Sequence, residues 1–573
     1  MKLNKLIYGI LTATVLSACA DKMEYHEYNN YDEDYVKLNF GNVGGLITDI
    51  YLKLDTDFGN YNGAMLASAT DEAEYAYTSN DIVDFYDGSW SATNAKSSMW
   101  STCYEGIANC NHYLEKFTGL TFPELELNDD YIEQMGRYNN YPYEVRFLRA
   151  YFYFNLVRQY GDVPFVDHML DAEESNTLTR RPAKEIFDYI ISECDEIKDL
   201  IIEDYSKVDR PIQPVEGGRA NKLTVLALKA RAALFAASPL FNPTNDSELW
   251  HRAALANMEV VNACEAAGMT LVPKYETLWA VKNYSDGIKE IIFGRRANRA
   301  TSTTESYNYP AGLTGSKGGN CPTQTLVDAY EMKETGLCWD EEGSGYEANN
   351  PYEGRDPRFE LTIAHNGSTW PKWNETPLQT FQGGLNGQPI TGGTPTGYYL
   401  KKLCHEEIDL RDNSTYKSDN HTWVTFRLGE FYLNYAETLF KYLGGADETS
   451  SEFVDNAGKQ VTARDMASRT RIRVGMPEFP IGMPKENFWK KYQNERMVEL
   501  AFEGHRFWDV RRWKEADKYF KNIDVMKITN NGDGYTYNRE TVTRMWDDKM
   551  YLFPIPRTEI MKNPNLTQNP GWN

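Results

Sequence analysis

The segment 494–513 holds the densest group of side chains that could carry out acid–base or metal chemistry. His505 stands within a few positions of Glu499, Glu503 and Asp509, and these residue types exchange protons and bind metal ions. Their spacing matches neither HExxH nor an equivalent ligand pattern. The segment is also rich in charges that can pair with one another locally. We therefore expect neither a catalytic group nor a metal site here.

Other catalytic patterns are missing from the sequence as well. A serine nucleophile would be indicated by GxSxG, but the chain reads Gly315-Ser316-Lys317-Gly318-Gly319, which does not fit that motif. No glycine-rich phosphate loop and no recognisable calcium loop is present, and no pair of carboxylates stands out for glycoside cleavage. The sequence predicts a non-catalytic protein without a cofactor.

A different chemistry is predicted at Cys19. Two lysines precede a short apolar run, 6–15, and Leu16-Ser17-Ala18 leads into the cysteine. This is the pattern of a signal peptide, and the run is shorter than the roughly 20 residues that a membrane span needs. A cysteine at this point can be acylated, and two or more lipid chains anchor a protein stably. An ordinary signal peptide with a chance cysteine is the alternative.

Four regions are predicted along the chain. They are a signal peptide at 1–18, a lipidated flexible tether at 19–36, an N-terminal helical region at 37–270 and a C-terminal region at 271–573 that forms one compact fold with it. No later apolar stretch is long enough to cross a membrane. The protein is therefore expected to be tethered to a membrane without spanning it.

Composition limits the possible partners. The chain has 83 acidic and 60 basic residues, a formal net charge of −23, and such a surface repels nucleic acids and anionic headgroups. Its 39 Tyr and 13 Trp offer apolar faces with a polar group, as binding surfaces require. The eight cysteines include no CxxC pair, which favours buried free thiols over a disulfide framework or a zinc site.

Helical periodicity recurs along most of the chain, and predicts helices over 143–160, 182–203, 220–237, 247–267, 426–443 and 486–513. The first has two apolar stripes, so it must pack on both sides. Sequential two-faced helices indicate stacked hairpins of the tetratricopeptide kind with degenerate repeats. In the last helix, Gly504 predicts a close packing partner. Local ion pairs are predicted there between Arg496 and Glu499 and between Glu503 and Arg506.

The chain changes character between about 270 and 420, where Gly and Pro are frequent and 290–293 could be a strand. Long irregular loops on a rigid scaffold usually carry the ligand site. The predicted fold class is therefore mainly α, with tetratricopeptide-like helical hairpins that support an irregular, loop-rich half with a few short strands.

Four motifs follow one another along nearly the whole mature chain. They are Arg146-Phe147-Leu148-Arg149-Ala150-Tyr151 leading to Tyr160-Gly161-Asp162-Val163-Pro164, then Arg355-Asp356-Pro357-Arg358, then the segment 494–513, and finally Tyr551-Leu552-Phe553-Pro554-Ile555-Pro556 with 563–571. In this order they resemble the signatures of the SusD/RagB family of outer-membrane nutrient-binding lipoproteins.

The resemblance implies display on the outer face of the outer membrane, held there by the lipid anchor, beside a SusC-like TonB-dependent transporter. Such proteins capture oligosaccharides, or in some members peptides, and deliver them into the barrel. Oligosaccharide capture is the favoured function. A peptide- or protein-binding surface lipoprotein on the same fold is the alternative.

A sugar site needs exposed aromatic faces with polar groups nearby, and two loop regions supply both. SusD-like proteins build their ligand site from loops in roughly these regions. The candidates are Asp71, Tyr75, Tyr86 and Trp90 in the first region, where Tyr77 and Asp84 also lie, and Tyr307, Tyr309, Trp370, Trp373 and Tyr398 in the second. Trp100 has a helical pattern with Tyr104 and Ile107 and is expected in the core.

Overall fold

The computed structural model describes residues 32–96, 99–205, 218–279, 289–296 and 299–572. The predicted signal peptide, Cys19 and most of the predicted tether lie outside these residues. The end of the tether differs from the prediction, because Glu33–Val36 (α2) forms a helical turn. The Asp32 side chain caps it by accepting the Tyr35 N–H at 2.9 Å.

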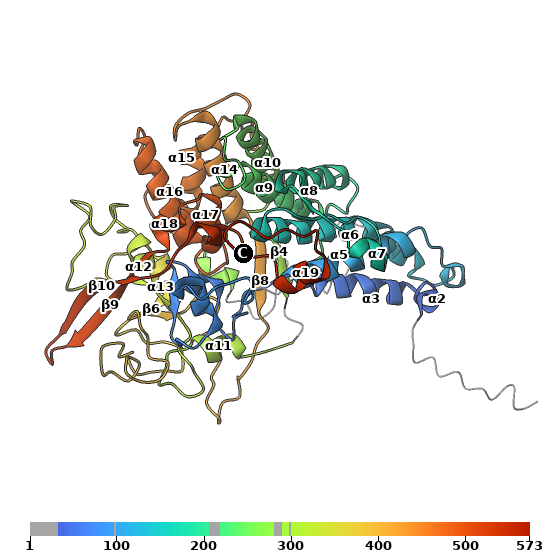
Figure 1. Ribbon diagram of the computed structural model, residues 1–573. Helices are drawn as coiled ribbons and strands as arrows, with labels where there is room; N and C mark the ends of the chain where they lie inside the picture. Colours follow the sequence, from blue (N-terminus) through green and yellow to red (C-terminus); the bar gives the residue numbers. More distant parts are fainter. Residues whose placement is uncertain (1–31, 97–98, 206–217, 280–288, 297–298, 573) are drawn as a thin grey trace, which may run out of the picture.

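A stack of helices forms one half of the molecule (Figure 1). Its members are α3 (Phe40–Tyr51), α5 (Met99–Lys116), α6 (Tyr131–Tyr160), α8 (Ala183–Ile197), α9 (Lys222–Ala237), α10 (Ser247–Ala266), α14 (Leu428–Leu443), α15 (Ala463–Arg473) and α16 (Lys485–Glu499). From α5 to α10 each helix packs on the next, and α10 then packs on α14 across the long loop region. The prediction of a mainly helical fold is confirmed.

The helix α6 is longer than predicted, because it begins at Tyr131 and contains Pro142. Proline has no N–H to donate and usually ends or kinks a helix. The predicted helix therefore started after Pro142, at residue 143. The two predicted apolar stripes are both buried, as Leu148 and Phe154 show. Gly161 ends the helix with a φ of 71°, which favours glycine.

The predicted helix over 486–513 is in fact two helices, α16 and α17 (Arg506–Arg512). Between them the backbone turns through left-handed conformations, with φ of 60° at Phe502 and 78° at Gly504. Gly504 is thus explained by its backbone conformation, since an added Cβ would only reach ordinary contact with Trp423, at 3.5 Å. The prediction that Gly504 has a close packing partner is therefore wrong.

The two predicted local ion pairs of this segment are also wrong. Arg496 pairs with Asp509 at 2.6 Å across the break. Glu503 accepts from Arg427 at 2.7 Å, and Arg506 forms a bidentate pair with Asp71 at 2.9 and 2.7 Å. Because the chain turns between α16 and α17, side chains that are neighbours in sequence face different partners.

A buried ionic core surrounds α16. We use this name for Arg358, Arg427, Arg471 and Arg473 with Glu290, Glu331, Glu495 and Glu499, whose side chains are at most 3% exposed. Arg427, for example, reaches Glu290 at 2.9 Å and Glu499 at 2.7 Å. Burial of these charges is possible because each one has a partner of opposite sign.

The described part of the chain contains five two-stranded antiparallel sheets. They pair β1 (Ala73–Tyr75) with β5 (Asn320–Pro322), β2 (Val163–Pro164) with β3 (Arg180–Arg181), β4 (Ile291–Arg296) with β8 (Thr422–Arg427), β6 (Ile363–Ala364) with β7 (Tyr399–Leu400) and β9 (Asn522–Asn530) with β10 (Tyr535–Thr543). The strand expected at 290–293 is present as the start of β4. The β9–β10 hairpin projects from one end of the molecule (Figure 1).

The remaining helices are short. They are η1 (Leu66–Ala69), η2 (Asp81–Val83), α4 (Asp84–Asp87), η3 (Pro123–Leu125), α7 (Ala172–Ser175), η5 (Tyr275–Leu278), α11 (Thr303–Asn308), α12 (Gln324–Ala329), α13 (Arg358–Thr362), α18 (Ala516–Tyr519), η6 (Asp548–Tyr551) and α19 (Arg557–Lys562). Most lie in loops that rest on the helical stack.

The C-terminal end of the described chain is joined to the turn after α6. The Asn569 side chain donates to the carbonyls of Tyr160 at 2.9 Å and Phe553 at 2.7 Å, and Arg180 donates to Asn569. Two of the sequence motifs, far apart in the chain, are thus in direct contact. Trp100 is buried, as predicted, and so are the seven cysteines from Cys103 to Cys404, all as free thiols. Within the described ranges no helix has the length and apolar character to span a bilayer.

Candidate ligand-binding site

Two of the candidate residues in the first loop region are part of the scaffold. Asp71 is fully buried in its ion pair with Arg506. Trp90 is 3% exposed and packs edge-on against Phe85 and Trp572, with ring centroids at 4.6 and 4.8 Å. Neither side chain presents a surface that a ligand could reach in this structure.

Four further candidates are also buried, namely Tyr75, Tyr309, Trp370 and Tyr398. Tyr309 contacts Trp370 edge-on at 4.9 Å and donates its hydroxyl to the carbonyl of His405 at 2.8 Å. The Tyr398 hydroxyl donates to Gln324 at 2.5 Å. These aromatic side chains form the interior of the loop-rich half. The sequence alone does not distinguish buried aromatic residues of a loop region from exposed ones.

Three candidates keep part of their surface exposed. The Tyr86 ring lies under Arg544 at 4.3 Å, and burial raises the pKa of its hydroxyl to about 12. Trp373 lies under Arg411 at 5.0 Å, and Tyr307 under the Lys317 ammonium at 4.2 Å. Of these, Tyr307 stands closest to the point where the two loop regions meet.

The two predicted loop regions are neighbours in space. Strand β1 pairs with β5, and the chain continues from β1 into Ala76, whose N–H donates to the Gly319 carbonyl at 2.9 Å. Tyr77 then donates its hydroxyl to the Lys317 carbonyl at 2.8 Å. Tyr77 thus joins the two regions through Lys317. No pattern in the sequence ranks Tyr77 above its neighbours.

An open groove of about 460 Å³ lies at this junction. We call it the Tyr77 groove; it is lined by Ala76, Tyr77, Thr78, Ser79, Gln382, Gln388, Pro389, Ile390, Thr391, Gly392 and Gly393. Its volume falls within the range of roughly 300–1,000 Å³ that is usual for small-ligand sites. One wall follows β1 and the other is a turn of the central loop region.

Glycine allows the two walls to approach closely. Gly392 has a φ of 75°, and a Cβ on it would lie 2.1 Å from the Lys317 carbonyl oxygen and 2.6 Å from the Tyr77 hydroxyl oxygen. No larger residue could occupy this position without moving the turn. The Tyr77 ring, which is half-buried, is therefore held in place at the junction.

The described residues that line the Tyr77 groove are all uncharged, although 25% of the chain is charged. The hydroxyls of Thr78, Ser79 and Thr391 and the amides of Gln382 and Gln388 line it without hydrogen bonds to the described part of the protein. Burial raises the pKa of Tyr77, so its hydroxyl remains protonated. The groove thus offers an aromatic ring, hydroxyls and amides to a neutral polar ligand.

The acids and the histidine of 499–509 do not form a reactive site. Burial and the charge of Arg231 lower the pKa of His505, and Glu499, Glu503 and Asp509 are each held by basic side chains. Among the residues that the structure describes, no group of His, Cys, Asp and Glu is arranged to hold a metal ion.

Comparison with known proteins places the chain in a family. Residues 289–572 match the model of the SusD family, and residues 26–234 match a model described as "Starch-binding associating with outer membrane". Together these matches leave only residues 1–25, 235–288 and 573 of the chain outside the two models.

Relatives and solved structures agree with this. A SusD-like protein, P2, of Formosa agariphila is 24% identical over 83% of this chain and 80% of its own length. A SusD-like protein of Bacteroides fragilis has a TM-score of 0.74 at 24% identity over 94% of this chain and 98% of its own. A SusD-like carbohydrate-binding protein of the same species has a TM-score of 0.73 at 22% identity over 93% of this chain and 100% of its own. The matches to the two family models, which together span most of the sequence, show that this chain belongs to the SusD family.

Proposed function

We propose that this protein captures neutral oligosaccharides at the cell surface through the Tyr77 groove and delivers them to a SusC-like TonB-dependent transporter in the outer membrane. The SusD family consists of binding proteins without catalytic activity. A structurally similar protein is described as carbohydrate-binding, and one of the matching family models is described as starch-binding and associated with the outer membrane. These descriptions support the ligand class and the location that we propose.

The uncharged lining of the Tyr77 groove is the observation that carries the proposal. A sugar ring has apolar C–H faces, which stack on aromatic rings, and a rim of hydroxyls, which bind amides and other hydroxyls. The groove supplies both in one place. An acidic glycan would find no counter-charge there and would be repelled by a chain of net charge −23.

Binding of the purified mature protein to a panel of neutral glycans, acidic glycans and peptides tests this proposal. We expect saturable binding to at least one neutral oligosaccharide and weaker binding to acidic glycans of the same length. Retention of peptides without any glycan would support the alternative function, a peptide- or protein-binding lipoprotein, and would contradict glycan capture.

The lipid anchor at Cys19 is part of the proposal. Because acylation requires the thiol, Cys19→Ala should move the protein out of the membrane fraction or leave its precursor unprocessed. Fractionation of cells with an antibody against the folded region, beside a Cys103→Ala variant as a control for the loss of a thiol, measures this. Unchanged fractionation of Cys19→Ala would contradict the anchor.

Delivery to a transporter can be tested by mild solubilisation of outer membranes and affinity purification of the tagged protein. We expect a TonB-dependent transporter of the SusC kind, encoded next to this protein, to purify with it. Recovery of the tagged protein alone under conditions that preserve other outer-membrane complexes would contradict the partnership.

A further inference from the structure

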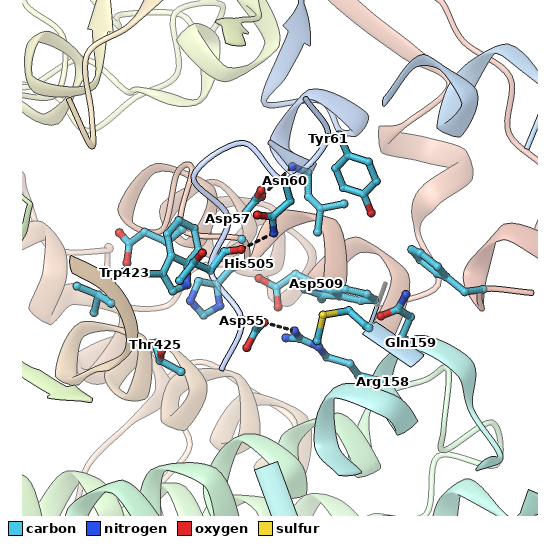
Figure 2. Close-up of a pocket in the computed structure, with 18 of the residues that line it drawn as sticks. Asp55, Asp57, Asn60, Tyr61, Arg158, Gln159, Trp423, Thr425, His505 and Asp509 are labelled. Carbon is cyan, nitrogen blue, oxygen red and sulfur yellow. Dashed lines mark hydrogen bonds and ion pairs between the residues drawn. The ribbon is translucent and has the colours of Figure 1, made fainter. Parts of the chain in front are cut away.

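A second concave region lies between the helical stack and the segment 55–62. This cavity has a volume of about 370 Å³. Its wall includes the end of α6 at Arg158 and Gln159, the strand β8 at Trp423 to Thr425, and the break before α17 at His505 (Figure 2). We call it the Asp57 cavity. It shares no lining residue with the Tyr77 groove.

Apart from Asp57, which has no ion-pair partner among the described residues, the charged side chains in the wall of the Asp57 cavity are neutralised by one another or by residues behind the wall. Asp55 pairs with Arg158 at 3.2 Å, as Figure 2 shows. Arg231 pairs with Glu430, Asp81 with Lys96, Glu503 with Arg427, and Asp509 with Arg496. A negatively charged ligand would therefore meet no free positive charge in this wall, whereas a neutral polar ligand can donate hydrogen bonds to the Asp57 carboxyl.

Several polar atoms of this wall lack a hydrogen-bond partner. The Asp57 Oδ1, the Thr425 Oγ1 and the Arg158 Nε atoms are buried, and none of them has a partner among the described residues. Asp57 is 6% exposed and Thr425 7% exposed. A buried polar atom left without a partner costs about 1–3 kcal/mol, so native proteins usually satisfy such atoms with water or a ligand.

The same wall has aromatic faces. Trp423, Trp508 and Tyr61 line the cavity, and the two tryptophans are largely buried. Burial and the nearby arginine Arg231 lower the pKa of His505, so its ring stays neutral and can both donate and accept a hydrogen bond. An aromatic wall with unpaired donors and acceptors suits a ligand that has apolar faces and hydroxyls.

We propose that the Asp57 cavity is a second binding site, separate from the Tyr77 groove, for a neutral sugar of one or two rings. Its volume is close to the lower limit of small-ligand sites, roughly 300 Å³, which excludes a long chain from the interior. Thr425 and Asp57 would bind hydroxyls of the sugar, and Trp423 would contact its apolar face.

Binding of neutral mono- and disaccharides to the full mature protein tests the second site. Calorimetry with glucose, galactose, mannose and their disaccharides is performed on the wild type and on three variants. Thr425→Val removes only the hydroxyl, and Thr422→Val makes the same change on the same strand outside the cavity. Asn60→Trp places a large side chain at an exposed position of the cavity rim.

We expect at least one of these sugars to bind, with affinity about tenfold weaker in Thr425→Val, unchanged in Thr422→Val, and lost in Asn60→Trp. Tyr77→Ala should leave this binding intact, which separates the second site from the groove. Binding that survives Asn60→Trp, or a crystal soaked in these sugars that shows only water in the cavity, would overturn the proposal. Loss of all binding in Tyr77→Ala would assign the sugars to the groove and overturn it too.

Discussion

The ionic core and the Tyr77 groove differ in the residues that build them. The ionic core buries four arginines and four glutamates at 3% exposure or less, whereas no charged residue lines the groove. The acidic and basic residues thus hold the scaffold together, and in the proposed function the ligand is recognised by Tyr, Gln, Ser and Thr side chains on turns. A cluster of charged residues in the sequence of this protein therefore indicates buried ion pairs of the scaffold rather than a reactive site.

The largest effect is expected from breaking the ionic core. Arg427→Met would remove one positively charged partner from each of three buried glutamates, Glu290, Glu499 and Glu503. Removing one partner of a buried pair costs roughly 3–5 kcal/mol. Denaturant unfolding of the variant and the wild type measures the loss.

Arg411→Met is the matched control for that change. Arg411 pairs with Asp409 at the surface, where its side chain is 47% exposed. An exposed pair contributes about 0–1 kcal/mol, so this variant should unfold almost as the wild type does. If Arg427→Met cost no more than Arg411→Met, the ionic core would not be the main support of this half.

Acid should weaken the scaffold through Glu437. Burial raises the pKa of this carboxyl, but the charge of Arg512 lowers it more, to about 2. The pKa of Glu437 in the folded protein lies below its unfolded value of 4.5. The pair of Glu437 and Arg512 therefore stabilises the fold fully at pH values above about 4.5. This stability, on the order of 3 kcal/mol, is lost as the pH falls from about 4.5 to about 2.

Glu437→Gln tests the effect of pH. The variant should unfold more easily than the wild type near neutral pH, and the difference in free energy of unfolding should shrink below about pH 4. Unfolding curves at several pH values give the free energy of unfolding of the wild type and of the variant. A difference that stayed constant with pH would show that the charge of Glu437 contributes nothing to stability.

Asp57 should show the opposite dependence on pH. Burial raises the pKa of its carboxyl from 3.8 to about 6, so the folded protein holds this proton more tightly than the unfolded chain. The stability that this provides is complete below about pH 3.8 and is lost as the pH rises through about 6. Asp57→Asn should therefore raise the free energy of unfolding on the order of 2 kcal/mol at neutral pH, and little near pH 4. An equal effect at both values would contradict the burial of an ionisable carboxyl.

Much of the fold could be predicted from the sequence, because helical periodicity depends on residues close together in the chain. The prediction of helix boundaries was wrong at two residues. Helix α6 continues through Pro142, and the left-handed backbone of Phe502 divides the last predicted helix in two. The Tyr77 groove lies where the two loop regions with a high aromatic content meet. The individual residues could not be predicted, because the burial of Asp71 depends on Arg506, more than 400 positions away.

The affinity of Tyr77 variants for a neutral oligosaccharide tests the central claim most directly. Tyr77→Phe keeps the ring, Tyr77→Ala removes it, and Tyr86→Ala removes a half-buried ring outside the groove. Loss of one stacking face costs up to about 1.5 kcal/mol, so calorimetry should show binding roughly tenfold weaker in Tyr77→Ala. Tyr77→Phe and Tyr86→Ala should bind nearly as the wild type does. Equal affinity of Tyr77→Ala and the wild type would contradict the assignment of the Tyr77 groove as the oligosaccharide site.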